Sequence, residues 1–335
     1  MIKYNDNTIN GVEYSGSNIT KVYYNDKVCY EYVLTPSHDY SQDYLTLTFK
    51  NYGNFVFSGG TVNYSTNSGK TWNKLTSNTP SYAVHGKVLL KGTLSPSANG
   101  VGRFSASTSF DVEGNSMSLL YGDDFVGQTS LYGANYTFVG LFSGCTGLTS
   151  AENLVLPATT LSNYCYQNMF NGCIGLTFTP KLPATTLTSY CYSNMFRNCT
   201  SLTAAPQLSA TTLATACYRG MFEGCTSLTS VQSVLPATTL AMGCYALMFY
   251  NCSNLSTAPE LPAAVLPTGC YQSMFYNCSN LNYIKCLAED ITAQYCTGYW
   301  VNGVSSTGTF VKAASMNSWT TDESGIPDGW TVQNA

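Results

Sequence analysis

The residues best able to do chemistry in this 335-residue chain are its fourteen cysteines. Cysteine binds zinc, forms disulfides or acts as a nucleophile, and the spacing decides among these roles. No two cysteines form a Cys-x-x-Cys pair, and the only histidines, His38 and His85, lie far from the cysteine-rich half. This pattern argues against a zinc site.

Most of the cysteines recur in two regular series. The first series is Cys165, Cys191, Cys217, Cys244 and Cys270, and the second is Cys173, Cys199, Cys225, Cys252 and Cys278. Stacked repeats would place neighbours of a series about 5 Å apart, which is feasible for a disulfide, but every pair would need one. We therefore expect buried ladders of small thiols, the usual behaviour of free cysteine.

Carboxylates offer little for catalysis. Asp123-Asp124 and Glu289-Asp290 are adjacent pairs whose side chains need not converge, and the repeats add only Glu152, Glu223 and Glu260. A glycosidase needs two carboxylates about 5 to 10 Å apart in a cleft. Two histidines and no glycine-rich phosphate loop argue against nucleophilic and nucleotide chemistry. We expect no enzyme, no cofactor and no metal.

The cysteines belong to an internal repeat. Met-Phe occurs at 169–170, 195–196, 221–222, 248–249 and 274–275, in steps of 26, 26, 27 and 26 residues. The surrounding frame is Cys-Tyr-x-x-Met-Phe-x-x-Cys-x-x-Leu, followed after a variable segment by Leu-Pro-Ala-Thr-Thr-Leu or a relative of it. A degenerate first copy begins at Phe138, and a degenerate last copy runs through Cys286 to Cys296. Five clear repeats with an atypical unit at each end are typical of a capped solenoid.

The spacing of apolar residues changes along each repeat. Tyr166, Met169, Phe170 and Cys173 stand at i, i+3, i+4 and i+7, which predicts a short helix. A Gly or Asn before the second cysteine, such as Gly172, predicts a left-handed stop. The later Leu-Thr-x-x-Pro and Leu-Pro-Ala-Thr-Thr-Leu segments predict short extended stretches.

This frame resembles the BspA-like leucine-rich repeats, which are found in surface proteins of gut and oral anaerobes and in their phages. The resemblance covers residues 138 to 300, with Met-Phe-x-x-Cys here in place of the family's Ala-Phe-x-x-Cys. Residues 308 to 332 are similar to the ending common in such proteins, which implies that Trp319 and Trp330 plug the open end. The resemblance implies a binding or scaffolding protein.

Strand patterns precede the repeats. Asn10-Gly11 is a hairpin signal, and 21–32 favours strands apart from Asn25-Asp26. Strands are also expected around 45–49, 55–57, 62–65, 88–91 and 104–112, as in a β-sandwich. We predict a mostly β fold with short helices: an N-terminal β module for attachment (1–36), a β-sandwich (37–120), a leucine-rich-repeat solenoid with its N-cap (121–300) and a C-terminal cap (301–335).

Composition limits the partners. Charged residues make up only 10 %, the net charge is −4, and no Lys/Arg run is present, so nucleic acid is not expected as a partner. The sequence contains no run of 18 apolar residues, so no membrane span is predicted. The first residues, Met1 to Asn7, lack the apolar stretch of a signal peptide. This favours a virion protein released by lysis over an exported adhesin.

Surface positions that vary within the fixed frame form the candidate binding surface. Four on the extended side, interpreted as one column, are Lys181, Gln207, Ser233 and Glu260. Four on the helix side are Arg197, Arg219, Tyr250 and Tyr276.

The functional hypothesis is a non-enzymatic bacteriophage virion component, such as a tail or head fibre or a decoration protein, that contacts the bacterial surface or its glycans. Its expected partners are other virion proteins bound through residues 1–36, further copies of itself, and a bacterial surface glycan or protein. The alternative is a BspA-type bacterial cell-surface adhesin that binds host proteins or glycans.

Overall fold

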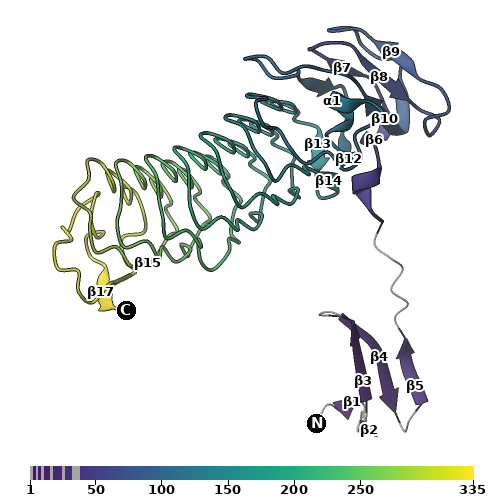
Figure 1. The fold of residues 1–335 in the computed structure, drawn as a ribbon. Helices are drawn as coiled ribbons and strands as arrows, with labels where there is room; N and C mark the ends of the chain where they lie inside the picture. The colour runs from purple at the N-terminus through teal and green to yellow at the C-terminus, as the bar shows by residue number, and fades with distance from the viewer. Residues whose placement is uncertain (1–2, 5–6, 9–10, 16–17, 25–26, 32–37) are drawn as a thin grey trace. The chain divides into compact units, whose positions relative to one another are not determined.

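The computed structural model describes residues 3–4, 7–8, 11–15, 18–24, 27–31 and 38–335, and side chains are described from residue 38 onward. The chain divides into two compact units, Met1–Asp39 and Tyr40–Ala335. In the first, β1 (Lys3–Tyr4) pairs with β2 (Asn7–Thr8), while β3 (Gly11–Ser15), β4 (Asn18–Tyr24) and β5 (Lys27–Glu31) form an antiparallel sheet (Figure 1). Asn10 of the predicted hairpin signal and Asn25-Asp26 lie outside the described residues.

The second unit begins with a sheet that caps the repeats. Its strands are β6 (Leu45–Gly53), β7 (Phe55–Phe57), β8 (Val62–Ser65), β9 (Asn73–Leu75), β10 (Val84–Lys91), β11 (Phe104–Ala106) and β12 (Phe110–Asn115). Antiparallel pairing gives the order β12-β6-β10-β8-β9, and β7 pairs separately with β11. Burial alternates along β10, where Val84, Val88 and Leu90 are buried and Leu89 is only half-buried. Each predicted strand is present, the segment 104–112 contains two, and β9 had not been predicted.

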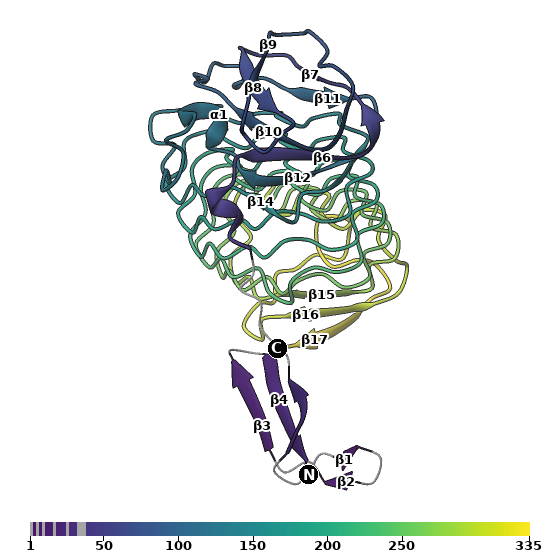
Figure 2. The same cartoon turned by 90° about the vertical axis from the view of Figure 1, so that its right-hand side faces the viewer.

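The repeats stack directly on this sheet. β12 pairs in parallel with β13 (Leu148–Ser150) and β14 (Leu154–Val155). The amide of Phe104 also donates to the carbonyl of Leu141 at 2.8 Å. Residues 40 to 335 form one compact unit, which contains both this sheet and the repeats. Figure 1 shows the coils following one another from the sheet to the C-terminal end, and Figure 2 shows them overlaying when seen nearly along the stack.

The predicted helix within each repeat is wrong. Within residues 38–335 the structure contains only α1 (Ser118–Tyr121) and the 3₁₀ turn η1 (Tyr40–Gln42) as helices. The segment around Met169 is a run of four-residue turns, because Tyr164, Asn168 and Gly172 have φ of +61°, +57° and +75°. A left-handed residue at every fourth position reverses the chain before an α-helix can propagate. The left-handed conformation predicted at Gly172 is confirmed.

In these turns, backbone hydrogen bonds between neighbouring coils take the place of the hydrogen bonds of an α-helix. The amide of Met169 donates within its own turn to Tyr166 O at 3.2 Å, while the amide of Phe170 donates to Met195 O in the next coil at 2.9 Å. This alternation satisfies the backbone both within a coil and between coils. The i, i+3, i+4, i+7 pattern still points inward, because a four-residue turn and a helical turn bury nearly the same positions.

The interior of the stack is made of continuous columns of identical side chains. Phe170, Phe196, Phe222, Phe249 and Phe275 stack with ring centroids 5.4 to 5.8 Å apart. A tyrosine column runs beside them from Tyr166 to Tyr271 with spacings of 5.6 to 6.1 Å. These side chains and the intervening methionines are almost completely buried. Each coil thus buries its apolar side chains against its two neighbours.

The C-terminal end is closed by parallel strands and tryptophans. β15 (Tyr283–Cys286), β16 (Thr309–Lys312) and β17 (Thr331–Asn334) form a three-stranded sheet at this end (Figure 1). Trp300 stacks on Trp319 with centroids 5.6 Å apart, and its Nε1 donates to Gly325 O at 2.8 Å. Trp330 is 7 % exposed and its Nε1 donates to Ser305 O at 2.7 Å. These tryptophans cover the last coil.

Candidate recognition surface

Outward-facing positions in the turns form columns that follow the stack. Residues 171, 197, 223, 250 and 276 lie in one column, linked through the coil-to-coil backbone bonds at the following position. Three predicted surface residues, Arg197, Tyr250 and Tyr276, therefore share this column. Tyr250 and Tyr276 stack with centroids 4.9 Å apart and planes 7° apart. Arg219 lies in the coil after that of Arg197 and in a different column, in which Ser193 and Ala246 are buried.

Arg197 is held by a charged neighbour in its own column. Its Nη2 lies 2.8 Å from Glu223 Oε1, and the Arg197 side chain is 41 % exposed while the Glu223 side chain is 15 % exposed. A half-exposed pair of this kind contributes little to stability. It fixes the direction of the guanidinium and makes this part of the column close to neutral.

On the extended side, Ser233 does not lie in the column interpreted from the sequence. Val234 forms the parallel bridge with Glu260, and Ser233 lies one residue earlier, where its carbonyl accepts from Glu260 N at 2.8 Å. The cause is the single 27-residue step, which places an extra residue before Leu235. Gln232 compensates for the insertion, since its Oε1 accepts from Leu208 N at 2.7 Å.

The extended side nevertheless brings two predicted residues together. Ser233 and Glu260 line an open groove of about 400 Å³ with Lys285 and Tyr283. Lys285 Nζ lies 3.0 Å from Glu260 Oε2, so the groove already contains a charge pair. Lys181 and Gln207 are exposed in earlier coils, outside this groove.

A second tyrosine stack was not singled out from the sequence. Tyr136, Tyr164 and Tyr190 lie on the outside of three successive coils, with centroid distances of 4.6 and 4.8 Å and interplanar angles of 6° and 11°. All three are half-buried and have φ near +60°. Burial raises the pKa of Tyr164, and the neighbouring rings of Tyr136 and Tyr190 raise it further. The only sequence signal is a tyrosine directly before Cys165 and Cys191.

Exposed threonines form a third regular feature. The Thr-Thr pairs at 159–160, 185–186, 211–212 and 238–239 are all exposed. Parallel bridges join Ser130 to Thr160 and Thr212 to Thr239, so hydroxyl groups recur at the spacing of the coils. The outer surface thus presents repeated hydroxyl, amide and phenol groups on a regularly bonded backbone.

The cysteines, by contrast, lie inside. All described cysteines are buried free thiols, as the ladder interpretation predicted. In the second series the thiol donates to a carbonyl of the preceding coil, for example Cys225 Sγ to Phe196 O at 3.1 Å. Burial raises the pKa of Cys191, Cys225, Cys244 and Cys278 to about 12. These protonated thiols are poor nucleophiles and poor metal ligands.

The two acidic pairs serve local contacts. Asp123 accepts from Lys91 Nζ at 2.7 Å and from Tyr44 Oη at 2.5 Å, and the bond from Lys91 first, then that from Tyr44, lowers the pKa of this carboxyl group. Glu289 accepts from Ser315 Oγ at 2.6 Å. Among the described residues, no group of three or more His, Cys, Asp or Glu side chains is arranged to hold a metal ion.

Comparison with protein-family models, curated proteins and solved structures gives no match for this chain. In the part of the chain that the structure describes, no helix has the length and apolar character needed to cross a membrane.

Proposed function

We propose that this protein is a non-enzymatic recognition component of a bacteriophage virion, such as a tail or head fibre or a decoration protein, which contacts the bacterial surface or its glycans. The repeats are proposed to be a BspA-like leucine-rich-repeat solenoid, and residues 37–120 a β-sandwich at its N-terminal end. Other virion proteins are the proposed partners of the N-terminal module.

The observation that carries this proposal is the outer tyrosine stack of Tyr136, Tyr164 and Tyr190. A bulky residue in the left-handed region costs about 1 to 2 kcal/mol relative to the usual conformation. The next three coils place Ala216, Gly243 and Gly269 at φ of +51° to +62° in the same column before Tyr295 returns to it, so the backbone does not need tyrosine at every coil. The stacked rings recover part of this cost and leave flat aromatic edges at the surface.

Such a surface suits weak, repeated contacts with carbohydrate. Tyrosine offers a rigid amphipathic ring, and the exposed Thr and Asn side chains offer donors and acceptors for hydroxyl groups. Each single contact is weak, but a repeating polymer meets the same groups in successive coils, and linked contacts strengthen one another.

The virion assignment draws on the resemblance to BspA-like repeats and on the two compact units. Residues 1–39 form a unit of their own, as an attachment module joined to a presented unit would require. The bacterial adhesin is the competing assignment, since the resemblance includes cell-surface proteins of the same anaerobes.

The proposal is tested by locating the protein and its target. Gold-labelled antibodies against residues 40–335 should decorate intact phage particles, whereas labelling of the producing bacterium without particles would favour the adhesin. The fluorescent full-length chain should bind saturably to a subset of anaerobic gut bacteria, and mild periodate oxidation of their surface glycans should abolish this binding. Absence of binding to every strain of a broad panel would contradict recognition.

A further inference from the structure

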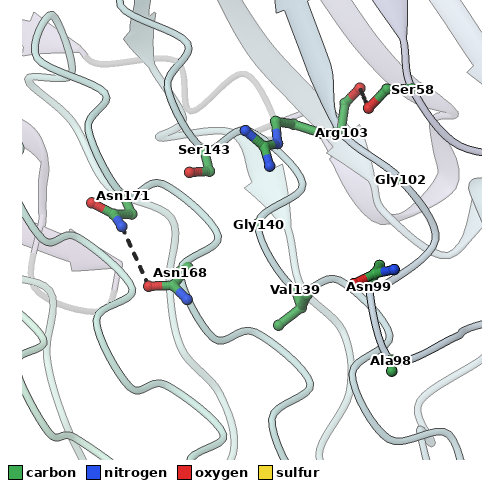
Figure 3. A pocket seen from close by; sticks show the side chains of 10 residues that line it. All are labelled: Ser58, Ala98, Asn99, Gly102, Arg103, Val139, Gly140, Ser143, Asn168 and Asn171. Atoms are coloured by element: carbon green, nitrogen blue, oxygen red, sulfur yellow. Dashed lines mark hydrogen bonds between the residues drawn. The ribbon is translucent and has the colours of Figure 1, made fainter. Parts of the chain in front are cut away.

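A separate pocket lies where the sheet meets the first two coils. It has a volume of about 420 Å³, and ten residues line it, including Arg103, Ser143, Asn99, Asn168 and Asn171. This volume falls within the range of small-molecule sites, about 300 to 1,000 Å³. Figure 3 shows the Arg103 guanidinium extending from the sheet side towards Ser143, with the amides of Asn168 and Asn171 on the coil side and Asn99 on the loop.

The walls of this pocket are fixed by the backbone. The loop before β11 is tied to the first coil by Val101 N donating to Thr137 O at 3.0 Å. Gly100 has φ of +76°, and a Cβ there would lie 2.9 Å from Val139 O, so glycine allows the loop to approach the coil. On the opposite wall, Asn168 N donates to Ser193 O at 3.0 Å. The pocket is therefore preformed.

The lining defines the charge of a ligand. Arg103 is the only charged side chain among the ten lining residues, and no carboxylate is present to neutralise it. The backbone of Arg103 is fixed by Ser58 N, which donates to Arg103 O at 2.8 Å, while its side chain remains exposed. A guanidinium presents two parallel N–H groups that match a carboxylate.

The remaining lining groups suit sugar hydroxyls. Asn171 Nδ2 donates to Asn168 Oδ1 at 3.4 Å, which leaves Nδ2 of Asn168 and Oδ1 of Asn171 as a donor and an acceptor. Ser143 adds a hydroxyl group that both donates and accepts. No aromatic side chain lines the pocket, so it offers no stacking slot for a nucleobase.

We propose that this pocket binds one acidic sugar unit, a hexuronic or nonulosonic acid, of a bacterial surface glycan. Arg103 binds the carboxylate, and Asn168, Asn171 and Ser143 bind ring hydroxyls. Tyr164 precedes Asn168 by one four-residue turn on the outside of the same coil, so the glycan would continue onto the outer tyrosine stack. This inference rests on the proposed function and narrows its ligand to one chemical class.

The chain offers matched variants for a test. Asn168→Gly removes the amide and keeps the left-handed backbone, and Asn194→Gly makes the same change one coil further along, outside the pocket. Arg103→Gln removes the guanidinium, with Lys74→Gln as its control, because Lys74 is an exposed cation that lies outside the pocket. All four variants should melt within a few degrees of the wild type.

Binding is measured on the full chain by saturation-transfer NMR with titration. The probes are D-glucuronic acid, N-acetylneuraminic acid, neutral D-glucose, sodium acetate and inorganic phosphate. We expect saturable binding of at least one acidic sugar, weakened at least tenfold by Arg103→Gln and at least threefold by Asn168→Gly. The two control variants should remain within twofold of the wild type, and D-glucose, acetate and phosphate should bind at least tenfold more weakly.

Absence of binding by both acidic sugars, or unchanged affinity in Arg103→Gln, would overturn the inference. Acetate or phosphate binding as tightly as the sugars would reduce the pocket to a general anion site and overturn the sugar assignment. Binding to bacterial cells that survives either result would show that the pocket inference has failed while the proposed function stands. Arginine-dependent sugar binding without any cell binding would show the reverse.

Discussion

Replacing Phe222 by alanine tests whether the repeats are held together by their internal columns. Phe222 lies in the middle of the phenylalanine column, 1 % exposed, with its ring centroid 5.8 Å from that of Phe196 and 5.7 Å from that of Phe249. Removing the ring takes away roughly 120 Å² of buried apolar surface, or about 3 kcal/mol at 25 cal/mol per Å². The cavity left between two rigid coils brings the expected loss to about 3 to 5 kcal/mol.

Urea denaturation of the full chain, followed by tyrosine fluorescence, measures the loss, with Phe178→Ala as the control. Phe178 is 56 % exposed, and the same substitution there should change the free energy of unfolding by less than about 1 kcal/mol. Hydrogen exchange should accelerate most in the coils next to residue 222, because each coil contacts only its neighbours. An equal effect of the two substitutions, or an unchanged midpoint for Phe222→Ala, would refute the column model.

Three further predictions concern thiols, the outer stack and the cap. Between pH 9 and 12 the unfolded chain loses thiol protons that Cys225 and Cys278 keep when folded. The free energy of unfolding should therefore fall as pH rises, by about 1.4 kcal/mol per pH unit for each thiol. A urea midpoint, measured in the presence of reductant, that rises from pH 8 to 10 would contradict this. Tyr164→Asn should change the free energy of unfolding by less than about 1 kcal/mol, since lost stacking is offset by relieved left-handed strain; a melting point lower by many degrees would instead assign Tyr164 a structural role. Trp330→Ala should destabilise the C-terminal coil by about 3 kcal/mol and speed its hydrogen exchange, and protection equal to the wild type would show that Trp330 does not cap the stack.

Much of the fold follows from the sequence because its main signal is local and repeated. The 26-residue period, the inward set of Tyr166, Met169 and Phe170, and the left-handed Gly172 all depend on residues close in the chain. The first strand of the capping sheet, β6, also alternates apolar and polar residues at Leu45, Leu47 and Phe49. Repetition strengthens the prediction, because the same residue pattern recurs in every coil.

Other features depend on contacts that the pattern does not contain. A run of four-residue turns and a helix bury nearly the same positions, so only the coil-to-coil backbone bonds distinguish them. The displacement of Ser233 required the strand register, which the 27-residue step shifts by one. The pocket at Arg103 joins a loop before β11 to coils 40 to 70 residues later in the chain, and no local signal predicts that meeting.

We propose that the outside of the coil stack recognises a bacterial surface. Cell binding after removal of the outer tyrosine stack tests this directly. The triple variant Tyr136→Asn, Tyr164→Asn and Tyr190→Asn keeps residues that accept the left-handed conformation, as Asn168 and Asn194 do. Bound fluorescent protein is measured by flow cytometry on a strain that binds the wild type. We expect a loss of at least tenfold in affinity at an unchanged melting temperature. Wild-type binding by the folded triple variant would contradict it.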